Sequence, residues 1–554
     1  MRLKNFERKA FKSFPFLWSL SLFAPRISQD SCHATSPTGS ALESGADWSG
    51  ACAGFSGTWI LSCDWLSYGM RKFLLTTAIL VAAAFPHMTS AQGCDGAGNC
   101  YVRAAATGAG TGADWTNAYT GFGSSAGLVN PASMTRGVTY YVAGGNYSIG
   151  SVITWNTPDA GTTPITIQAP TIAIHGTSTG WSNSYQAQAV WSSWYVESDY
   201  WTFNGVYRGS GAGLPATDWR TGYGFKINNN NGANANIGGS GIWLGPTSGT
   251  GSNVTVEYVE IAGSGDTTGT YGDRGITDNY GQNPVIQFNY VHDTGNCSLV
   301  FDAVGKVFAE YNWLMNDQST PEVHAEGIAL RGPMTVTIAY NYLENEEGTG
   351  YIGTPCPSDG CNNGRGTWSF YGNVFFANPS EWHGNTSPQN GLSYAFIQFF
   401  AGSWTALTFY NNTIYQISGS SPMGACQAVN GGSVTGTAFT AQNNLFGNCS
   451  TSGTPGPGGL TSLTYTNNTY CSVASAGDSG TGIQNLASCS LFSSPSTNNF
   501  ALASDTSAWA ALSSPYNVDL LGDTRTSSRG AFQMGGVAAN VPAPPTSLIA
   551  TVQQ

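Results

Sequence analysis

Charged side chains are scarce in this chain: Asp, Glu, Lys and Arg make up 9% of its 554 residues, against about a quarter in an average soluble protein. Basic residues are fewer than acidic ones, with 19 Lys and Arg against 31 Asp and Glu, and the sequence contains no basic patch. We therefore expect no nucleic-acid partner. The shortage of charge does not indicate disorder, because 12% of the residues are aromatic and the apolar pattern is regular. The 72 glycines, with many Ser, Thr and Asn, instead indicate a folded chain with many turns.

A long apolar run is also lacking. Phe73 to Phe85 is too short to span a membrane, and it follows Arg71 and Lys72 and precedes Thr89–Ser90–Ala91. This pattern predicts a secretory signal peptide over 70–91, cut before Gln92. We expect residues 1–69 to be a spurious upstream extension, with Met70 as the true start. From Gln92 onward, 11 basic residues face 26 acidic ones, a net charge of −15.

The sequence also contains no CxxC pair or His/Cys cluster with the spacing of zinc ligands, so a zinc site is not expected. An exported chain can form disulfides. Sequence spacing predicts four pairs and leaves Cys297 free. The predicted pairs are Cys94–Cys100, Cys356–Cys361, Cys426–Cys449 and Cys471–Cys489.

What the chain does contain is a repeat. Seven alternating apolar runs each carry an asparagine beside an aromatic or apolar residue, as in Ile338–Ala339–Tyr340–Asn341–Tyr342–Leu343. An eighth copy is expected at Val254–Val259, with Glu257 in place of the asparagine. Period-two alternation predicts strands, and unequal spacing of 23–39 residues favours a solenoid over a propeller. Stacked asparagines then bond along the axis, as in cross-β ladders.

With these repeats, the opening Gly108–Ala109–Gly110–Thr111–Gly112 and the closing Leu521–Gly522–Asp523–Thr524–Arg525, the chain resembles the right-handed parallel β-helix proteins of the pectin-lyase-like fold. The resemblance covers roughly residues 100–537. It implies an all-β, single-stranded solenoid with Asn and aromatic ladders. We expect an N-terminal cap at 92–135, the β-helix at 136–537 and a Pro-rich tail at 538–554. The fold alone does not specify a substrate.

The acidic residues gather in one part of the chain, between Glu257 and Glu347, and His292 and His324 lie there too. His324 and Glu326 alternate in an extended segment, so they are expected on one face as an acid/base pair. Aligning the copies on Glu257, Asn289, Asn312 and Asn341 predicts that Glu260, His292, Met315 and Glu344 form one row along the solenoid. Aligning the preceding strands makes Arg274 equivalent to Glu326, two coils apart. The predicted catalytic residues are His324, Glu326, Arg331, His292 and Asp293, and the predicted substrate-binding residues are Arg274, Glu260 and Glu344.

A structural role for this strip is an open alternative, with turn residues bonded to backbone and Ca²⁺ held among the carboxylates. A register slip of one residue would turn every side chain to the other face. Four aromatic residues are candidates for stacking on sugar rings or for packing: Tyr290, Trp313, Tyr342 and Trp368.

The expected function is that of a secreted, monomeric, polysaccharide-active lyase or hydrolase without a membrane span. Signatures of polygalacturonases, pectate lyases and alginate-type lyases are missing, so no particular enzyme is indicated. The alternative is a non-catalytic extracellular adhesin or glycan-binding protein.

Overall fold

The computed structural model describes residues 93–148, 150–206, 219–228, 239–245, 253–264, 273–279, 283–302, 305–317, 325–331, 335–346, 348–354, 365–382, 395–399, 404–417, 429–431, 438–448, 462–473, 480–504, 510–526 and 528–534. All of them belong to one compact unit, Pro86–Gln554. The predicted signal peptide, the segment before it and the tail from 538 lie outside the described residues. No helix in the part described is long and apolar enough to cross a membrane.

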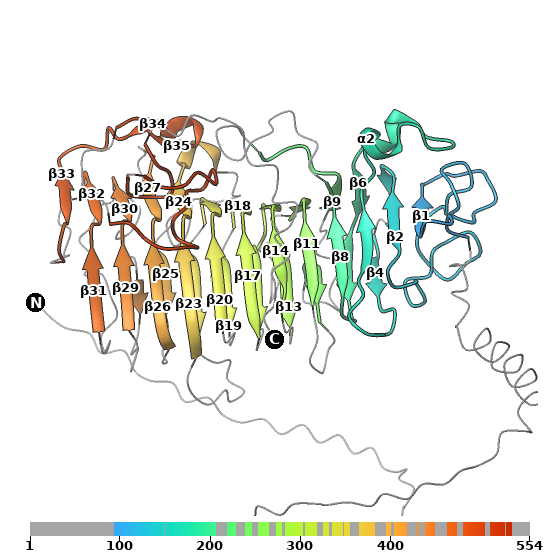
Figure 1. The fold of residues 1–554 in the computed structure, drawn as a ribbon, viewed down its shortest axis with the longest axis horizontal. Coiled ribbons are helices and arrows are strands. Elements are labelled where there is room, and N and C mark those ends of the chain that lie inside the picture. The colour runs from blue at the N-terminus through green and yellow to red at the C-terminus, as the bar shows by residue number, and fades with distance from the viewer. Residues whose placement is uncertain are drawn as a thin grey trace, which may run out of the picture. The chain divides into compact units, whose positions relative to one another are not determined.

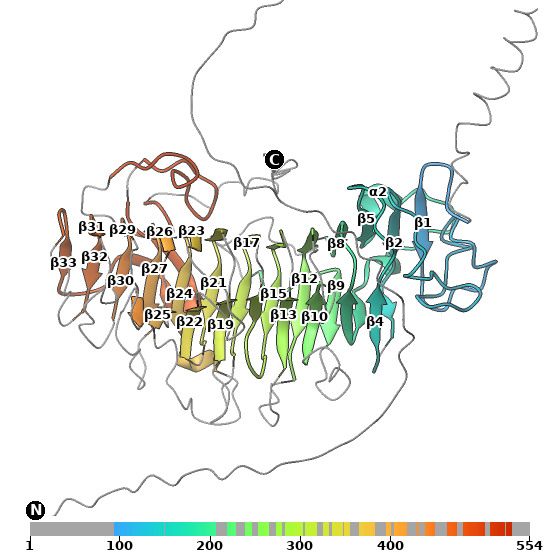
Figure 2. The ribbon, with the colours of Figure 1, turned by 90° about the horizontal axis from the view of Figure 1, so that it is seen from below.

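Three parallel sheets run side by side along the stack of coils (Figures 1 and 2). Sheet 1 contains β1 (Asn99–Val102), β2 (Thr139–Val142), β5 (Ile165–Gln168), β8 (Trp201–Asn204), β11 (Val254–Glu257), β14 (Val285–Gln287), β17 (Lys306–Glu310), β20 (Thr335–Ala339), β23 (Arg365–Tyr371), β26 (Trp404–Tyr410), β29 (Ala438–Gln442) and β31 (Ser462–Thr466).

Sheet 2 contains β3 (Gly145–Asn146), β6 (Ala189–Trp191), β9 (Phe225–Asn228), β12 (Val259–Ala262), β15 (Tyr290–His292), β18 (Trp313–Met315), β21 (Tyr342–Glu344), β24 (Val374–Ala377), β27 (Thr413–Gln416), β30 (Leu445–Gly447), β32 (Thr469–Cys471) and β33 (Gln484–Leu486). Sheet 3 contains β4 (Val152–Trp155), β7 (Ser193–Val196), β10 (Ser240–Leu244), β13 (Arg274–Asn279), β16 (Leu299–Asp302), β19 (Ala325–Arg331), β22 (Gly348–Thr354), β25 (Ala395–Phe399) and β28 (Val429–Gly431).

From β4 to β30 the chain visits sheets 3, 1 and 2 in turn, as β13, β14 and β15 do before β16 begins the next coil. The prediction of a parallel β-helix is therefore confirmed. Shorter elements lie outside the three sheets: the antiparallel pair β34 (Phe492–Ser494) and β35 (Asn499–Leu502), helix α2 (Ile172–His175) and 3₁₀ turns at Asn183–Gln186, Pro379–Glu381 and Pro495–Thr497.

Alternate side chains of every sheet point into the coil and form the core. In sheet 2, Val291, Leu314 and Leu343 are fully buried one above another. Trp368, a predicted sugar-stacking candidate, is also fully buried, 5.3 Å from Trp404 in the core. It packs inside the solenoid and does not face a glycan.

A seven-residue asparagine ladder follows sheet 1, as the repeats predict. The side-chain amide of Asn312 donates to Oδ1 of Asn341 at 3.0 Å, and Asn341 donates to Asn373 at 3.1 Å. Asn289, Asn412, Asn444 and Asn468 continue the ladder in both directions. Each amide also donates to a backbone carbonyl of the preceding coil, so these buried polar groups are satisfied in the interior.

The residue before each ladder asparagine, and Tyr258 at the equivalent position one coil earlier, adopts a left-handed backbone that turns the chain from sheet 1 into sheet 2. Tyr258, Phe288, Tyr311 and Tyr340 have φ of 56–58°. Their rings stack at centroid distances of 4.9–5.0 Å. Left-handed backbone is costly for bulky residues, and here the stacked rings and the ladder on either side hold it in place.

The expected eighth ladder position is wrong. Glu257 pairs with Gln287, not with Asn289, and the backbone N–H of Val259 donates to Asn289 instead. Val259 thus takes the asparagine's place, two residues beyond Glu257. Because this position holds valine and not asparagine, the copy lacks the residue on which the other copies are aligned.

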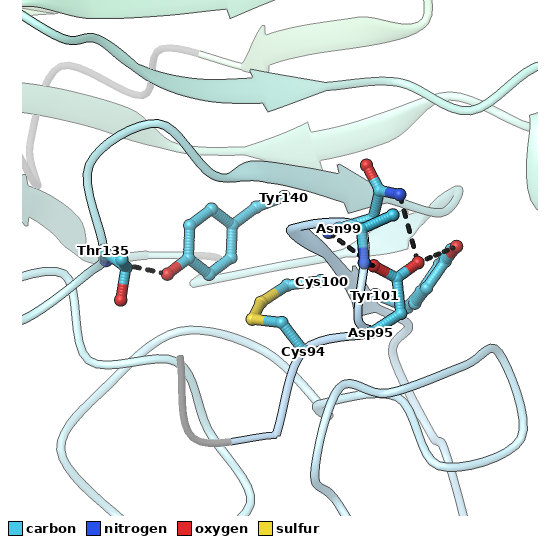
Figure 3. The surroundings of a disulfide bond; sticks show 8 residues. Cys94, Asp95, Asn99, Cys100, Tyr101, Thr135 and Tyr140 are labelled. Atoms are coloured by element: carbon cyan, nitrogen blue, oxygen red, sulfur yellow. Dashed lines mark hydrogen bonds between the residues drawn. A yellow bond between two sulfur atoms is a disulfide. The ribbon is translucent and has the colours of Figure 1, made fainter. Parts of the chain in front are cut away.

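Two of the predicted disulfides are present. Cys94–Cys100 closes the turn before β1, where Asp95 accepts hydrogen bonds from Asn99 and Tyr101 (Figure 3). Cys471–Cys489 joins β32 to the segment that follows β33. Cys297 is free and buried, as expected. Cys356, Cys361, Cys426 and Cys449 lie outside the described residues.

Candidate functional site

The outer face of sheet 2 carries three of the predicted site residues close together. Glu260 on β12 pairs in register with Tyr290 on β15, and His292 lies at the end of β15. Ile261 and Val291 between them point into the core, which fixes the charged side chains outward. The Tyr290 ring stacks on His292 at 4.3 Å. The side chains of His292 and Glu260 are partly exposed, each with 16% of its surface accessible to solvent.

His292 is held between two carboxylates. Its Nδ1 lies 2.7 Å from Oδ2 of Asp293, and its Nε2 lies 3.5 Å from Oε1 of Glu260. Burial alone lowers the pKa of His292, but the hydrogen bonds and charges of Asp293 and Glu260 outweigh it and raise that pKa above its usual value. His292 is therefore a proton carrier whose Nδ1 side is fixed by a carboxylate.

Glu260 is also bound by two groups from earlier coils. Nζ of Lys226 on β9 lies 2.5 Å from Oε1, and Gln188 donates to Oε2 at 2.8 Å. Burial alone raises the pKa of Glu260, yet bonds from His292, Lys226 and Gln188 bring it down to about 2. We call Gln188, Lys226, Glu260, His292 and Asp293 the His292 cluster.

Asp293 also has a structural task. Its φ of 56° turns the chain out of sheet 2, as Asn316 and Asn345 do with φ of 60° and 57° in the next coils. Asp and Asn tolerate this conformation better than most residues. Asp293 thus occupies a corner position and directs its carboxylate back to the preceding histidine.

Glu344, predicted to bind substrate, is fully buried on the same sheet face. Its Oε2 accepts from the Trp313 indole at 3.1 Å and lies 3.6 Å from Nη1 of Arg220. Arg220 bonds Glu381 at 2.5 Å, and its guanidinium lies 4.9 Å from the centre of the Trp313 ring. Trp313 and Tyr342 are buried here beside Trp219. Of the aromatic residues proposed for sugar stacking, Tyr290 alone remains partly exposed in the part of the chain described.

Glu326 belongs to a different cluster, at the start of sheet 3. The register of Ile276, Leu299 and Ile328 makes Arg274, Cys297 and Glu326 equivalent in successive coils, as the sequence alignment of Arg274 with Glu326 predicts. The Cys297 thiol donates to Oε2 of Glu326 at 3.2 Å. Burial raises the pKa of Glu326 to about 7.

Arg331, at the far end of β19, bonds Asp302 at 2.5 Å. His324 lies outside the described residues, so its pairing with Glu326 stays a prediction.

The predicted single strip is thus separate groups. His292, Met315 and Glu344 do form one row, as the sequence alignment gives it. Glu260 does not belong to that row, because Ala262 is the residue in register with His292. Because the alignment took Glu257 instead of Val259 as the ladder position, it also placed Glu260 two residues out of register. Glu260 still reaches His292 from the neighbouring strand.

No protein-family model matches this chain, and no curated protein sequence matches it. Among solved structures it is similar to an alginate lyase from Paenibacillus sp. str. FPU-7, with 15% sequence identity and a TM-score of 0.29 over 60% of this chain and 91% of that one. A likeness of this size does not bear on the reaction or the substrate.

Lys226, Gln188 and Arg220 escaped the prediction from sequence. Lys226 could have been found from the sequence, because only two lysines follow residue 91 and this one lies between the apolar residues Phe225 and Ile227, which the structure shows to be buried. Gln188 and Arg220 reach the site from segments that carry no repeat. Among the described residues, no group of three or more His, Cys, Asp or Glu side chains is arranged to hold a metal ion.

Proposed function

We propose that this chain is a secreted polysaccharide-active enzyme of the pectin-lyase-like group, in which His292 transfers the proton. The observation that carries the proposal is the 2.7 Å contact between His292 and Asp293, with Nε2 facing Glu260 at a partly exposed position. A carboxylate on one ring nitrogen fixes the tautomer and leaves the other nitrogen for acid/base work.

The composition of the His292 cluster favours a lyase over a hydrolase. Elimination from a uronate needs a base for the carbon-bound proton and a cation for the charge that develops on the sugar carboxylate. The cluster contains one such base, His292, and one cation, Lys226. In this proposal Nε2 of His292 removes the carbon-bound proton beside the sugar carboxylate, the electron pair left behind forms a carbon–carbon double bond, and the glycosidic C–O bond breaks. The protonated His292 then gives its proton to the leaving oxygen. Lys226 shifts from Glu260 towards the substrate carboxylate.

The competing proposal is a glycan-binding protein without catalysis. It is favoured by the fact that Lys226, Glu260, His292 and Asp293 already neutralise one another. Such a network also stabilises a fold without doing chemistry.

The test is digestion of a panel of polysaccharides by the secreted protein, followed by unsaturated-uronate absorbance and by reducing ends. Absorbance with reducing ends indicates a lyase, reducing ends alone a hydrolase, and neither signal with retained binding the glycan-binding protein. For a lyase, His292→Ala should lower turnover by about 10²–10⁴-fold. Asp293→Asn should lower it less and shift its pH profile.

Asn130→Ala, an exposed change in the N-terminal region, serves as the matched control and should leave turnover unchanged. His324→Ala and Glu326→Gln belong in the same assay, because both residues remain predicted catalytic groups. If His292→Ala keeps full activity and His324→Ala loses it, the catalytic site lies around Glu326 and not in the His292 cluster.

A further inference from the structure

The corner between sheets 2 and 3 contains a buried stack of polar residues that the proposed reaction does not use. The register of His292, Met315 and Glu344 places Thr294, Asp317 and Glu346 two residues later in successive coils. All three side chains are fully buried. Charged residues at such positions need partners, because burying a lone charge is very costly.

Asp317 ties both ends of the turn that follows the His292–Asp293 pair. It accepts a hydrogen bond from the Thr294 hydroxyl at the start of the turn. At the end of the turn it accepts from the Ser298 backbone N–H at 2.8 Å and from the Ser298 hydroxyl at 2.7 Å. Asp317 therefore fixes the segment Thr294–Ser298, which begins one residue after Asp293.

Glu346 lies at the equivalent position of the following coil and is a side-chain hydrogen-bond partner of Asp317. No N–H or O–H group of the described residues donates to either of its carboxylate oxygens. Burial raises the pKa of Glu346 well above its usual value, and the nearby charges of Asp317 and Glu344 raise it further. Two buried carboxylates in contact cannot both be ionised without a counter-charge. Burial also raises the pKa of Asp317, but hydrogen bonds from Glu346, Thr294 and Ser298 hold it to about 7. Asp317 is therefore the first of the two to ionise, and the protonated Glu346 donates to it while it accepts from the turn.

The other titratable groups around the turn do not supply that counter-charge. Asp273 accepts from the Gly295 N–H on the opposite side of the turn, and burial raises its pKa to about 6. The Cys297 thiol is fully buried, with a raised pKa, and bonds Glu326. The charge of Arg274 lowers the pKa values of Cys297 and Glu326.

We propose that Asp317 and Glu346 share one proton, and that this proton latches the turn Thr294–Ser298 and with it the corner that presents His292 and Asp293. Only the consequence for catalysis rests on the proposed function; the latch itself is a property of the fold. Its sign follows from burial. A carboxyl whose pKa is raised by folding stabilises the fold fully below its ordinary pKa, and loses that contribution as the pH rises through the raised value. The turn is therefore held at acidic and neutral pH and released at alkaline pH.

The experiment is hydrogen–deuterium exchange of the full secreted chain at about pH 6 and about pH 9, expressed as protection relative to the intrinsic rate at each pH. Wild type should lose at least about tenfold protection in peptides covering residues 292–299, since one unit of pKa corresponds to a factor of ten. Glu346→Gln supplies an amide donor to Asp317 at every pH and should keep its protection. Asp317→Asn, whose amide can donate to an ionised Glu346, should also abolish the pH dependence and serves if Glu346→Gln is not secreted.

Glu310→Gln is the matched control, because Glu310 is a half-buried carboxyl with a raised pKa but lies on sheet 1. It should leave the pH dependence of the 292–299 peptides as in wild type. Equal pH dependence in wild type and both latch variants overturns the proposal. Restoration of wild-type protection at about pH 9 by millimolar Ca²⁺ also overturns it, because a cation and not a proton would then join the carboxylates. If the chain cleaves no polysaccharide, the exchange result still decides the latch.

Discussion

His292 shows at the scale of one residue how burial and partner charges oppose each other. Asp293→Asn removes the carboxylate at 2.7 Å and should lower the pKa of His292, because the bond and charge of Asp293 help to raise it. Since the pKa of His292 is raised on folding, its ion pair stabilises the protein below the ordinary histidine pKa, and that contribution disappears as the pH rises through the raised value. NMR titration of the His292 ring measures the shift. An unchanged pKa of His292 would show that Asp293 shapes the left-handed corner and has no electrostatic effect on His292.

Glu310 gives a second residue-scale prediction. Burial raises its pKa to about 7, against which its hydrogen bond with Tyr371 acts only in part. Its stabilising contribution is therefore lost as the pH rises through about 7. Glu310→Gln should unfold at higher denaturant concentration than wild type at about pH 8, by about 1–2 kcal/mol after allowance for its partial exposure, and show no gain at about pH 5. A gain of the same size at both pH values would point to packing and not to ionisation.

The asparagine ladder is the feature on which stability depends at the scale of elements. Asn341→Ala removes the donor to Asn373 and to the Ala309 carbonyl and the acceptor for Asn312. The loss should be about 1–3 kcal/mol, because buried partners are left unsatisfied. Chemical denaturation measures it, and Asn130→Ala at the surface should stay within about 0.5 kcal/mol of wild type. Equal effects of the two changes would mean that the ladder adds nothing to stability.

At this scale the sequence predicts strands and ladder well and the site only in part. Alternation and a recurring asparagine are local marks, and they are enough to place seven coils along the chain. Val259 carries no such mark, so the register slipped there and misplaced Glu260. The left-handed corners at Asp293 and Asn316 separate the sheet 2 side chains from Glu326, which simple alternation does not reveal. Contacts such as Gln188 with Glu260 join residues far apart in sequence and leave no pattern to read.

At the scale of the whole molecule, the two disulfides between described residues lie outside the regular central coils. Cys94–Cys100 joins the turn before β1 to β1 itself, and Cys471–Cys489 lies at the last strands of sheet 2. Reduction should cost about 2–4 kcal/mol per bridge and loosen these segments first, because coils in a solenoid depend mainly on their neighbours. Thermal unfolding with and without reductant, followed by exchange mapping, tests this. Loss of protection around Asn341 together with that near residue 471 would contradict it.

The net charge of the whole molecule governs how it meets a substrate. From Gln92 the chain carries a charge of −15, so an anionic polysaccharide is repelled at long range. Added salt screens this repulsion, with a Debye length of about 8 Å at physiological ionic strength. Binding of a polyuronate should therefore tighten or quicken as salt rises from low levels, and Ca²⁺ bridging carboxylates of protein and glycan should act in the same direction and be reversed by EDTA. A neutral glycan should show neither effect. Rates measured on both substrates across a salt series decide the point, and a polyuronate rate that falls steeply with salt would mean that local cations such as Lys226 and Arg220 dominate over the net charge.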